Sequence, residues 1–537
     1  MSRWRLDRIE EGDLGGIDIS RLIVNGQWDL SDHISYIQPD DKNPFDSTVV
    51  SISLPEQVRP DRTIRIEIEF ICRLPRLIAR TGYQDNFFML GQWFPKIGVF
   101  RDGQWNCHQF FRHSEFFADF GTYDVNITLP AEYVVGSSGI LVREEQKDSL
   151  KLLSFRAEDV HDFAFTAWPE YRQIKKTVNA VEVILLYAPE HSSKVSRYFD
   201  IIEFALGYTA NWLMPYPYPQ LTLVDVPLYA FEAGGMEYPA LITCHSMWGI
   251  PENVKWFLEE CTLHEFLHQY FYGILASNEA EEPWLDEGLT SYATKKILSE
   301  RYGRHRSAST FLNILVGAFD GAKKNYMGSP DVSITMKPSW AFKPGTYYVS
   351  VYSKPMLMLQ TLENILGTVR MDSIMNSYIR SWKFKHPRTR DFLEIVHQNS
   401  FRDMRKFFQQ ALYDSVVLDY SVASVRQKRD DKGELLGTDI TFKRLGDFIC
   451  PVEIAYTYAT GQTVLSEWSG MDSMLVLSIG GPDPVISAQV DPEHKIWLDV
   501  NWTNNSYAVK ENPLAFYRHW LKALKMYQQV LIGFFGF

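Results

Sequence analysis

Two histidines and a glutamate in the segment His264-Glu-Phe-Leu-His268 are the residues of this chain best suited to chemistry. On a helix, residues i and i+4 lie on one face one turn apart, so both imidazoles can reach a single metal ion. Glu265 projects about 100° further round the helix, where it can hold a water molecule without being a ligand. Two hydrogen-bonded histidines on a helix are the alternative. The spacing favours a metal site with a general base beside it.

A carboxylate further along the chain completes a ligand set. Glu287 follows His268 after 18 intervening residues, within the segment 282–292. Two histidines and one carboxylate leave a fourth position open, as catalytic zinc sites do and structural sites do not. Such a metal lowers the pKa of its water to about 7, and Glu265 can then take the proton and pass it to a leaving nitrogen. These residues predict a hydrolase with one Zn2+ per chain.

The elements that must position these residues are helical. Apolar residues recur at helical spacing from about residue 195 to 415. Glycines at 273, 303 and 367 mark expected helix ends. A strand-like stretch, 220–225, precedes a Gly-Gly turn. The predicted helices are 196–214, 254–273, 283–303, 351–366, 391–399 and 401–412.

Period-two alternation of apolar and polar residues flanks this helical region on both sides. It is clearest at 63–70 and 123–129 before the helices, and at 425–442 and 452–458 after them. Such alternation is typical of half-buried antiparallel strands. We therefore predict a multidomain α+β chain whose three parts pack directly together. The predicted domains are an N-terminal β-sandwich or saddle-shaped sheet (1–190), a mostly helical catalytic domain (191–415), and a small C-terminal β-domain with a terminal helix (416–537).

Composition excludes several classes of protein. Lys and Arg number 54 against 66 Asp and Glu, a net charge of −12, so the basic stripe that a nucleic-acid partner needs is missing. Five scattered cysteines form neither a disulfide framework nor a cysteine-built zinc site. No stretch approaches the ~18 apolar residues of a transmembrane segment. We expect the apolar end, 530–537, to dock as a strand or helix rather than to contact a membrane.

The location and oligomeric state follow less directly from the sequence. The first residues contain no apolar signal sequence, so a cytoplasmic location is the default expectation. The N-terminal β-domain begins late, so we expect a preceding segment to be missing. Export or membrane association is then the alternative. Nothing in the sequence indicates an oligomeric state.

The HEFLH segment followed by WLDEGLTSY resembles the HExxH-x18-E gluzincins of the aminopeptidase N family, which includes leukotriene hydrolase and cold-active aminopeptidases. Two further segments agree. Gly234-Gly-Met-Glu-Tyr238 is similar to the family's exopeptidase motif, and Tyr352-Ser-Lys354, which begins 65 residues after Glu287, is similar to the segment with the transition-state tyrosine. The resemblance covers nearly the whole chain. It implies a thermolysin-like catalytic domain, without the C-terminal helical domain of larger relatives.

The resemblance also implies roles for these residues. Glu237, expected on an edge strand, would accept the protonated α-amine of a peptide with a free N-terminus. Gly234, Gly235 and Met236 would line that site, and the glycines would let the main chain approach the substrate. Tyr352 would donate its phenol to the oxyanion. The implied function is a zinc aminopeptidase that removes single N-terminal residues.

Departures from the family pattern keep alternatives open. Tyr238 replaces the motif's Asn and is expected to reshape the first side-chain pocket, while Pro355 replaces a Gly and fits a first helical turn. A zinc endopeptidase, or a peptidase of altered specificity without amine anchoring, is one alternative function. A non-catalytic binding scaffold on the same fold is another.

Several nearby residues have a structural as well as a functional interpretation. His245 is expected to be a packed histidine rather than a fourth ligand, and Tyr347 and Tyr348 are expected to be cleft-wall residues. Asp286 could orient a zinc histidine from behind. The segment 92–95 could form part of the cleft wall.

Overall fold

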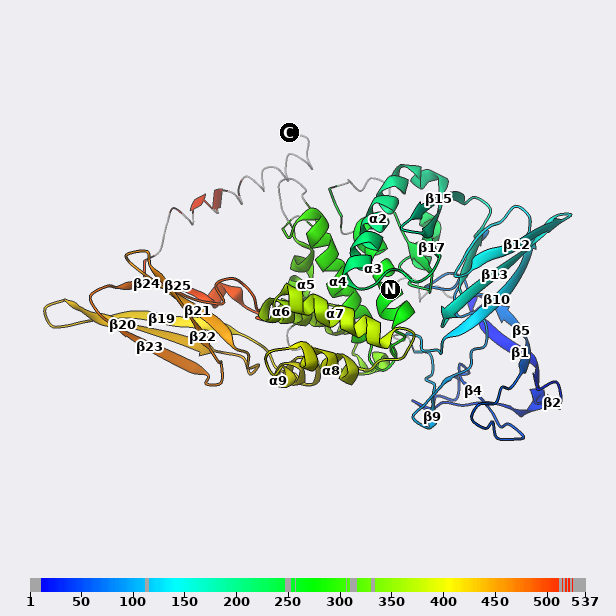
Figure 1. Cartoon of the computed structure of the whole chain (residues 1–537), viewed down its shortest axis with the longest axis horizontal. Coiled ribbons are helices and arrows are strands. Elements are labelled where there is room, and N and C mark those ends of the chain that lie inside the picture. Colours follow the sequence, from blue (N-terminus) through cyan, green and yellow to red (C-terminus); the bar gives the residue numbers. More distant parts are fainter. Residues whose placement is uncertain are drawn as a thin grey trace.

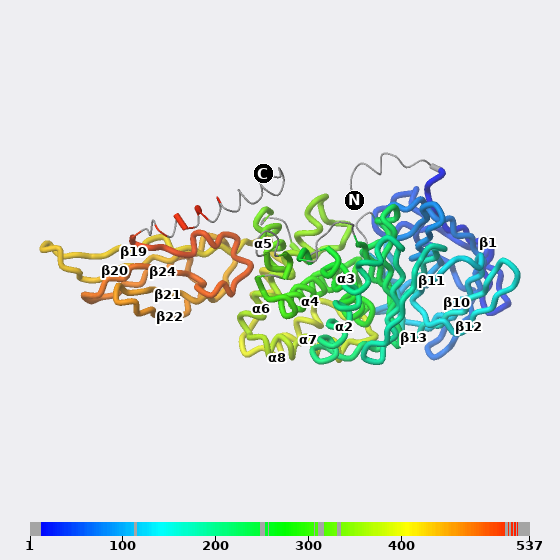
Figure 2. Tube along the Cα trace, turned by 90° about the horizontal axis from the view of Figure 1, so that it is seen from above, coloured from blue at the N-terminus to red at the C-terminus, as the bar shows by residue number. Residues whose placement is uncertain are grey.

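The computed structural model describes residues 11–111, 115–246, 253–255, 257–305, 307–309, 316–329 and 334–510, and residues 514, 517, 518, 520, 521 and 524. Within this part of the chain, an N-terminal β region, a central helical region and a C-terminal β region follow one another along an elongated molecule (Figures 1 and 2). The multidomain α+β fold is confirmed.

The N-terminal β region consists mainly of short antiparallel sheets. The alternation at 63–70 falls on β5, which pairs with β1, and that at 123–129 falls on β10, which pairs with β13. Both stretches are therefore strands, as predicted. The strand orders are β2-β1-β5, β10-β13-β12 and β11-β14-β7-β6. Their bounds are β1 Gly16–Val24, β2 Trp28–Asp29, β5 Ile66–Arg73, β6 Gly82–Gln84, β7 Phe87–Leu90, β10 Gly121–Pro130, β11 Val134–Ser137, β12 Ile140–Lys147, β13 Leu150–Val160 and β14 Phe165–Trp168. Two small hairpins join β3 Ile34–Tyr36 to β4 Val50–Ile52 and β8 Val99–Arg101 to β9 Gln104–Asn106.

A mixed sheet supports the helices of the central region. Its order is β15-β16-β17-β18, with bounds Arg172–Val178, Val181–Tyr187, Gln220–Asp225 and Leu241–Cys244. The pair β15–β16 is antiparallel, whereas β16–β17 and β17–β18 are parallel. Every residue of β17 is buried, because helices and the N-terminal region cover both faces. Two strands of this sheet precede residue 190 and two follow it, so the sheet crosses the predicted boundary between the first two domains. The boundaries of the three domains stay a prediction.

The predicted helices of the central region fall on α2, α3, α4, α6, α8 and α9, whereas α5 and α7 were not predicted. Their bounds are α2 Val195–Trp212, α3 Leu258–His268, α4 Trp284–Tyr302, α5 Ala318–Met327, α6 Lys354–Leu366, α7 Thr368–Trp382, α8 Thr389–Asn399 and α9 Arg405–Phe408. Gly303 and Gly367 end α4 and α6 with φ of 85° and 87°, a conformation that glycine adopts without strain. A π-helical segment, Gln269–Ile274, continues α3, so this helix ends one residue after the expected stop at Gly273.

The C-terminal β region is a sandwich of two antiparallel sheets, ordered β19-β20-β23 and β22-β21-β24-β25. The predicted hairpin is confirmed as β19–β20. Bounds are β19 Tyr420–Arg429, β20 Leu435–Arg444, β21 Val452–Tyr458, β22 Thr463–Trp468, β23 Met474–Gly480, β24 Val485–Val490 and β25 Ser506–Ala508. The predicted terminal helix is described only in part, and the apolar end 530–537 lies outside the described residues.

One continuous apolar core joins the three regions, as the sequence predicted. A single buried cluster runs from Leu153 in β13 through the central helices to Leu498 beyond β24. Lys323 of α5 also links the central helical region to the C-terminal β region. Its buried ammonium donates to the main-chain oxygens of Trp497, at 2.9 Å, and Asp499.

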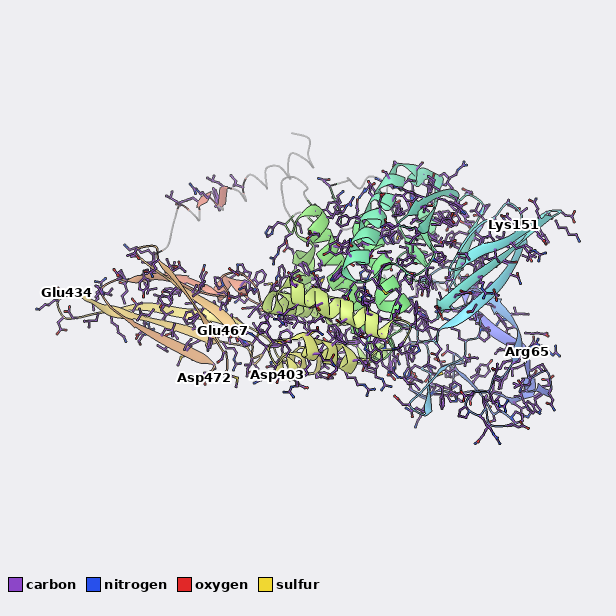
Figure 3. All side chains as sticks on the ribbon, viewed as in Figure 1. Arg65, Lys151, Asp403, Glu434, Glu467 and Asp472 are labelled. Carbon is purple, nitrogen blue, oxygen red and sulfur yellow. The ribbon has the colours of Figure 1, made fainter. Side chains whose placement is uncertain are left out.

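The surface carries much of the chain's charge. Arg65, Glu434 and Asp472 project from the outer strands and turns (Figure 3). Of the helices described, none combines the length and apolar character that crossing a bilayer requires.

Candidate metal centre

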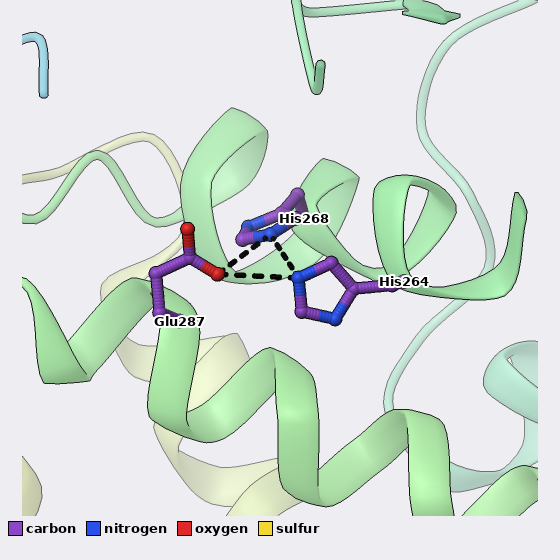
Figure 4. Close-up of side chains that lie close together, drawn as sticks. All are labelled: His264, His268 and Glu287. Carbon is purple, nitrogen blue, oxygen red and sulfur yellow. Dashed lines mark hydrogen bonds and ion pairs between the residues drawn. The ribbon is translucent and has the colours of Figure 1, made fainter. Parts of the chain in front are cut away.

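Three side chains from two packed helices converge as the sequence predicted. The Nε2 atoms of His264 and His268, on α3, lie 3.0 Å apart, and Glu287 Oε2, from the first turn of α4, lies 3.2 and 3.3 Å from them (Figure 4). His268 and Glu287 are buried, whereas the side chain of His264 is 19% exposed. The group is therefore open to solvent on the His264 side.

The triangle has the size that a zinc ion requires. Ligands at ~2.0–2.1 Å from a tetrahedral ion are ~3.3 Å from one another. The three separations of 3.0, 3.2 and 3.3 Å are close to this value. Two nitrogen donors and one oxygen donor at these separations fit a divalent cation with one coordination position left for a reactant.

Asp286 holds one of the histidines from behind. His268 Nδ1 donates a short hydrogen bond to Asp286 Oδ1, and Thr290 Oγ1 lies 3.3 Å from the same nitrogen. A carboxylate only accepts, so the proton is on Nδ1 and the lone pair of Nε2 faces the triangle. Asp286 thus makes the contact with a candidate zinc-binding histidine that the sequence allowed.

The ligand carboxylate also contacts Tyr352, which lies in a π-helical segment, Val349–Ser353, just before α6. Tyr352 Oη donates to Glu287 Oε1. Burial disfavours the charged carboxylate, but the two histidines outweigh it and hold the pKa of Glu287 well below its ordinary value. Pro355 lies in the first turn of α6, as its sequence position required, and Tyr348 stacks on Tyr352 at 4.8 Å.

Glu265 lies beside the triangle, in a site that excludes most water. Its side chain is only 6% exposed, and burial, reinforced by Cys261 and Glu237, raises its pKa well above the ordinary value. Gly235 lies across from it with φ of 77°, and a Cβ there would come 3.8 Å from Glu265 Oε1. The missing side chain leaves room beside the general-base candidate.

The segment that carries Glu237 is attached to both the sheet and the metal helix. Met236 forms a single antiparallel bridge with Thr243 of β18, so Glu237 follows a bridge rather than lying in the expected edge strand. Gln269, directly after His268, donates to the main-chain oxygens of Glu237 and Tyr238 at 3.2 and 3.0 Å. Ala240 N donates to Gln269 Oε1 at 2.7 Å. This one buried amide ties the segment to the metal helix.

A second acidic group surrounds Glu237. One carboxylate oxygen each from Glu115, Glu237 and Glu279 lie within 4.8 Å of one another, and all three residues are buried. Arg80 binds both oxygens of Glu115, one at 2.7 Å. Burial raises the pKa of Glu237 to about 8, although His268 and Arg80 oppose the shift. Burial, followed by Asp286, raises the pKa of Glu279 well above its usual range.

Other expected residues lie outside this centre. His245 packs between the rings of Phe231 and Phe257, with centroids at 4.1 and 4.9 Å, as the packed-histidine interpretation predicted. Trp93, from the 92–95 segment, donates to Phe163 O at 3.0 Å and packs on the large core. Tyr238 is 1% exposed. Its effect on the first side-chain pocket stays a prediction.

The comparisons with known proteins agree with this geometry. Residues 198–411 match the model of the Peptidase family M1 domain. The chain carries a peptidase family M1 domain. The match contains the triangle, Glu237 and Tyr352. The resemblance of the sequence to the aminopeptidase N family of gluzincins is confirmed.

Individual relatives resemble the M1 domain at low identity. Mouse aminopeptidase B is 27% identical over 217 residues, which are 39% of this chain and 32% of that protein. Leucine aminopeptidase 2 of Yarrowia lipolytica is 26% identical over 197 residues, 35% of this chain and 29% of the relative. The match therefore spans about a third of each relative's length.

A solved structure shares the fold over most of the chain. Legionella pneumophila aminopeptidase A, in complex with aspartic acid, superposes with a TM-score of 0.66 at 14% identity. The match covers 92% of this chain and 56% of the Legionella chain. At this identity the likeness concerns the architecture, including the two β regions outside the M1 domain.

Sequence reasoning missed four residues of the site. Arg80 and Glu115 come from the N-terminal region, and their pairing across 35 residues leaves no pattern in the sequence. Glu279 stands in the acidic run 279–282, which is typical of a solvated loop. Gln269 directly follows the second histidine, and its position on the metal helix is the one signal that could have pointed to it.

Proposed function

We propose that this chain is a zinc-dependent aminopeptidase that hydrolyses the N-terminal peptide bond of peptides with a free N-terminus. The observation that carries the proposal is the triangle of His264, His268 and Glu287, with Glu265 beside it. The proposed metal is one Zn2+ per chain. The names of the relatives, aminopeptidase B and leucine aminopeptidase 2, support an exopeptidase.

Each group beside the triangle has a role in this proposal. When bound, zinc supplies a Lewis acid and an acidified water. Glu265 accepts the proton of the attacking water and delivers it to the leaving nitrogen. Tyr352 donates its phenol to the oxygen of the tetrahedral intermediate, turning from Glu287 to do so. Glu237 accepts the substrate's α-ammonium and limits cleavage to the first bond.

The experiment is hydrolysis of a panel of aminoacyl fluorogenic amides by the purified protein, with and without a chelator. We expect activity that chelation abolishes and zinc restores. Glu265→Gln should lower kcat by about 10²–10⁴-fold while zinc content is unchanged. Full activity of Glu265→Gln with zinc retained would defeat the mechanism. Zinc binding without hydrolysis of any substrate would favour a non-catalytic scaffold.

An endopeptidase, or a peptidase of altered end-specificity, is the second candidate, since the same triangle could serve a substrate without a free amine. N-acetylated peptides separate the two. An aminopeptidase cleaves the free-amine peptide and leaves its acetylated form intact. Equal cleavage of both would remove Glu237 from its assigned role and favour the second candidate.

A further inference from the structure

We propose that His108, when protonated, acts as a pH-controlled latch that holds the N-terminal β region onto the loop 275–283, which leads into α4. The latch is the set of three side chains His108, Asp40 and Glu281. The inference goes beyond the proposed function, because the latch controls a contact within the fold and takes no part in the hydrolysis.

His108 lies between two carboxylates from distant parts of the chain. Its Nδ1 is 2.8 Å from Asp40 Oδ1, in the segment between β3 and β4, and its Nε2 is 3.0 Å from Glu281 Oε1. An ionised carboxylate only accepts hydrogen bonds, so both ring nitrogens must donate, and only the protonated imidazole has two N–H groups. The geometry therefore corresponds to the charged form of His108.

The surroundings of the latch also favour the cation. The side chains of His108 and Asp40 are 19% and 13% exposed, so solvent weakens their attraction only in part. The ring of Trp340, in the short 3-10 helix Ser339–Ala341, lies 4.7 Å from that of His108, which allows a cation–π contact. Burial opposes the charge, but the hydrogen bonds to Glu281 and Asp40 outweigh it and raise the pKa of His108 above its ordinary value.

The charged groups on the elements around His108 are mostly acidic. The segment between β3 and β4 contributes Asp40 and Asp41, the loop 275–283 contributes Glu281, and the short helix with Trp340 has no charged residue. The hydrogen bond from His108 and, further away, the charge of Arg388 lower the pKa of Glu281. Glu281 therefore stays ionised over the range in which His108 titrates.

Loss of the proton breaks the latch in either tautomer. Neutral imidazole keeps one N–H group, and its other nitrogen then presents a lone pair to a carboxylate oxygen, which is repulsive. Asp40 still accepts from Gln109 N, at 2.9 Å, and Glu281 still accepts from Asn106 Nδ2, also at 2.9 Å. Because each carboxylate keeps another donor, the contact that yields is one of the two with His108.

The latch holds a loop that leads to the metal centre. The loop continues into α4, whose first turn carries Asp286 and Glu287. Beside the latch, Asn278 Nδ2 donates to Asn106 Oδ1 at 3.0 Å, a neutral contact that does not titrate. Since the closed latch binds the proton more tightly, it is fully closed below the ordinary pKa of histidine, ~6.5, and opens as pH rises through the raised pKa.

Two measurements on the full chain test the latch. The first follows the Cε1–H resonance of His108 by NMR as pH is varied, identified by its absence in His108→Gln. We expect a midpoint above ~6.5. The second is amide hydrogen exchange of the peptide 276–282, compared between variants at the same pH so that the intrinsic pH dependence of exchange cancels.

His108→Gln imitates the open latch, because its amide has a single nitrogen to donate from, as neutral imidazole does. At pH 6 the peptide 276–282 should exchange about 10-fold more slowly in wild type than in His108→Gln, the size expected for a hydrogen bond between charged groups. At a pH about two units above the measured midpoint, the two proteins should exchange equally fast, because almost all of His108 is then neutral.

Glu281→Gln separates a latch that responds to pH from a merely structural contact. An amide both donates and accepts, so it can pair with either form of His108. Its loop should therefore keep the same protection relative to His108→Gln on both sides of the midpoint. The variant should also lower the midpoint of His108, and this shift identifies the resonance if His108→Gln does not fold.

His33→Gln is the matched control, since it removes an exposed histidine of the same N-terminal region, in the short helix Ser31–His33. It should match wild type in both measurements. A His108 midpoint at or below ~6.5 would overturn the inference, and so would equal exchange of wild type and His108→Gln at pH 6. A difference that persists unchanged above the midpoint would overturn it as well, because the contact would then not respond to pH.

Discussion

Asp286→Asn tests whether the carboxylate behind His268 prepares the metal centre. The asparagine keeps the shape of the side chain and an oxygen that accepts the Nδ1 proton, so only the charge is lost. A hydrogen bond to a charged group contributes about 1.5–3 kcal/mol and a neutral one about 0.5–1.5 kcal/mol. The difference of about 1–1.5 kcal/mol corresponds to about a 10-fold weaker affinity for zinc.

Asp286→Ala removes the contact itself. Loss of such an outer partner costs about 10–100-fold in metal affinity, and the complete burial of Asp286 favours the upper end. The two variants should therefore form a graded series, about 10-fold for asparagine and about 100-fold for alanine.

The assay is a zinc titration against a competing chromophoric chelator, with thermal unfolding of each variant to confirm that it folds. Thr290→Val is the matched control, because Thr290 lies 3.3 Å from the same nitrogen but carries no charge. Its zinc affinity should stay within about threefold of wild type. Wild-type affinity in Asp286→Ala would refute the assignment of Asp286 as the residue that orients His268.

Three further substitutions probe the surrounding structure. Gly234→Ala should destabilise the protein by about 1–3 kcal/mol in urea unfolding, because its Cβ would come 2.7 Å from His245 Nδ1, and a wild-type midpoint would contradict this. Gln269→Leu leaves buried main-chain groups without partners, so it should lower the free energy of unfolding by about 3 kcal/mol or more. It should also raise KM, because the segment with Glu237 is no longer held in place. Unchanged stability and KM would argue against this role of Gln269. Burial lowers the pKa of Lys323 to about 8, whereas the unfolded chain keeps this proton up to about pH 10.4. Between these values the unfolded state binds more protons, so the free energy of unfolding of wild type relative to Lys323→Met should rise from pH 8 to pH 10, and a flat difference would refute the shift.

The sequence by itself identified the candidate metal ligands and the helices that carry them. His264 and His268 are one helical turn apart, so a helix alone places both rings on one face. Gly303 and Gly367 end helices because glycine adopts positive φ without strain, a local property that needs no tertiary context. The same local logic identified the strands of the two β regions, whose alternation follows from side chains pointing to opposite faces.

Only the tertiary structure decided which acids surround Glu237. Glu115 and Glu279 are far apart in the sequence, where a charged residue is most simply interpreted as exposed to solvent. They come together with Glu237 and are buried because the N-terminal region packs against the loop before α4. The parallel pairing of β16 with β17 likewise joins segments on the two sides of α2. Periodicity encodes what a residue does within its own helix or strand, whereas contacts between distant segments depend on burial and charge in the assembled fold, which leave no repeating pattern in the chain.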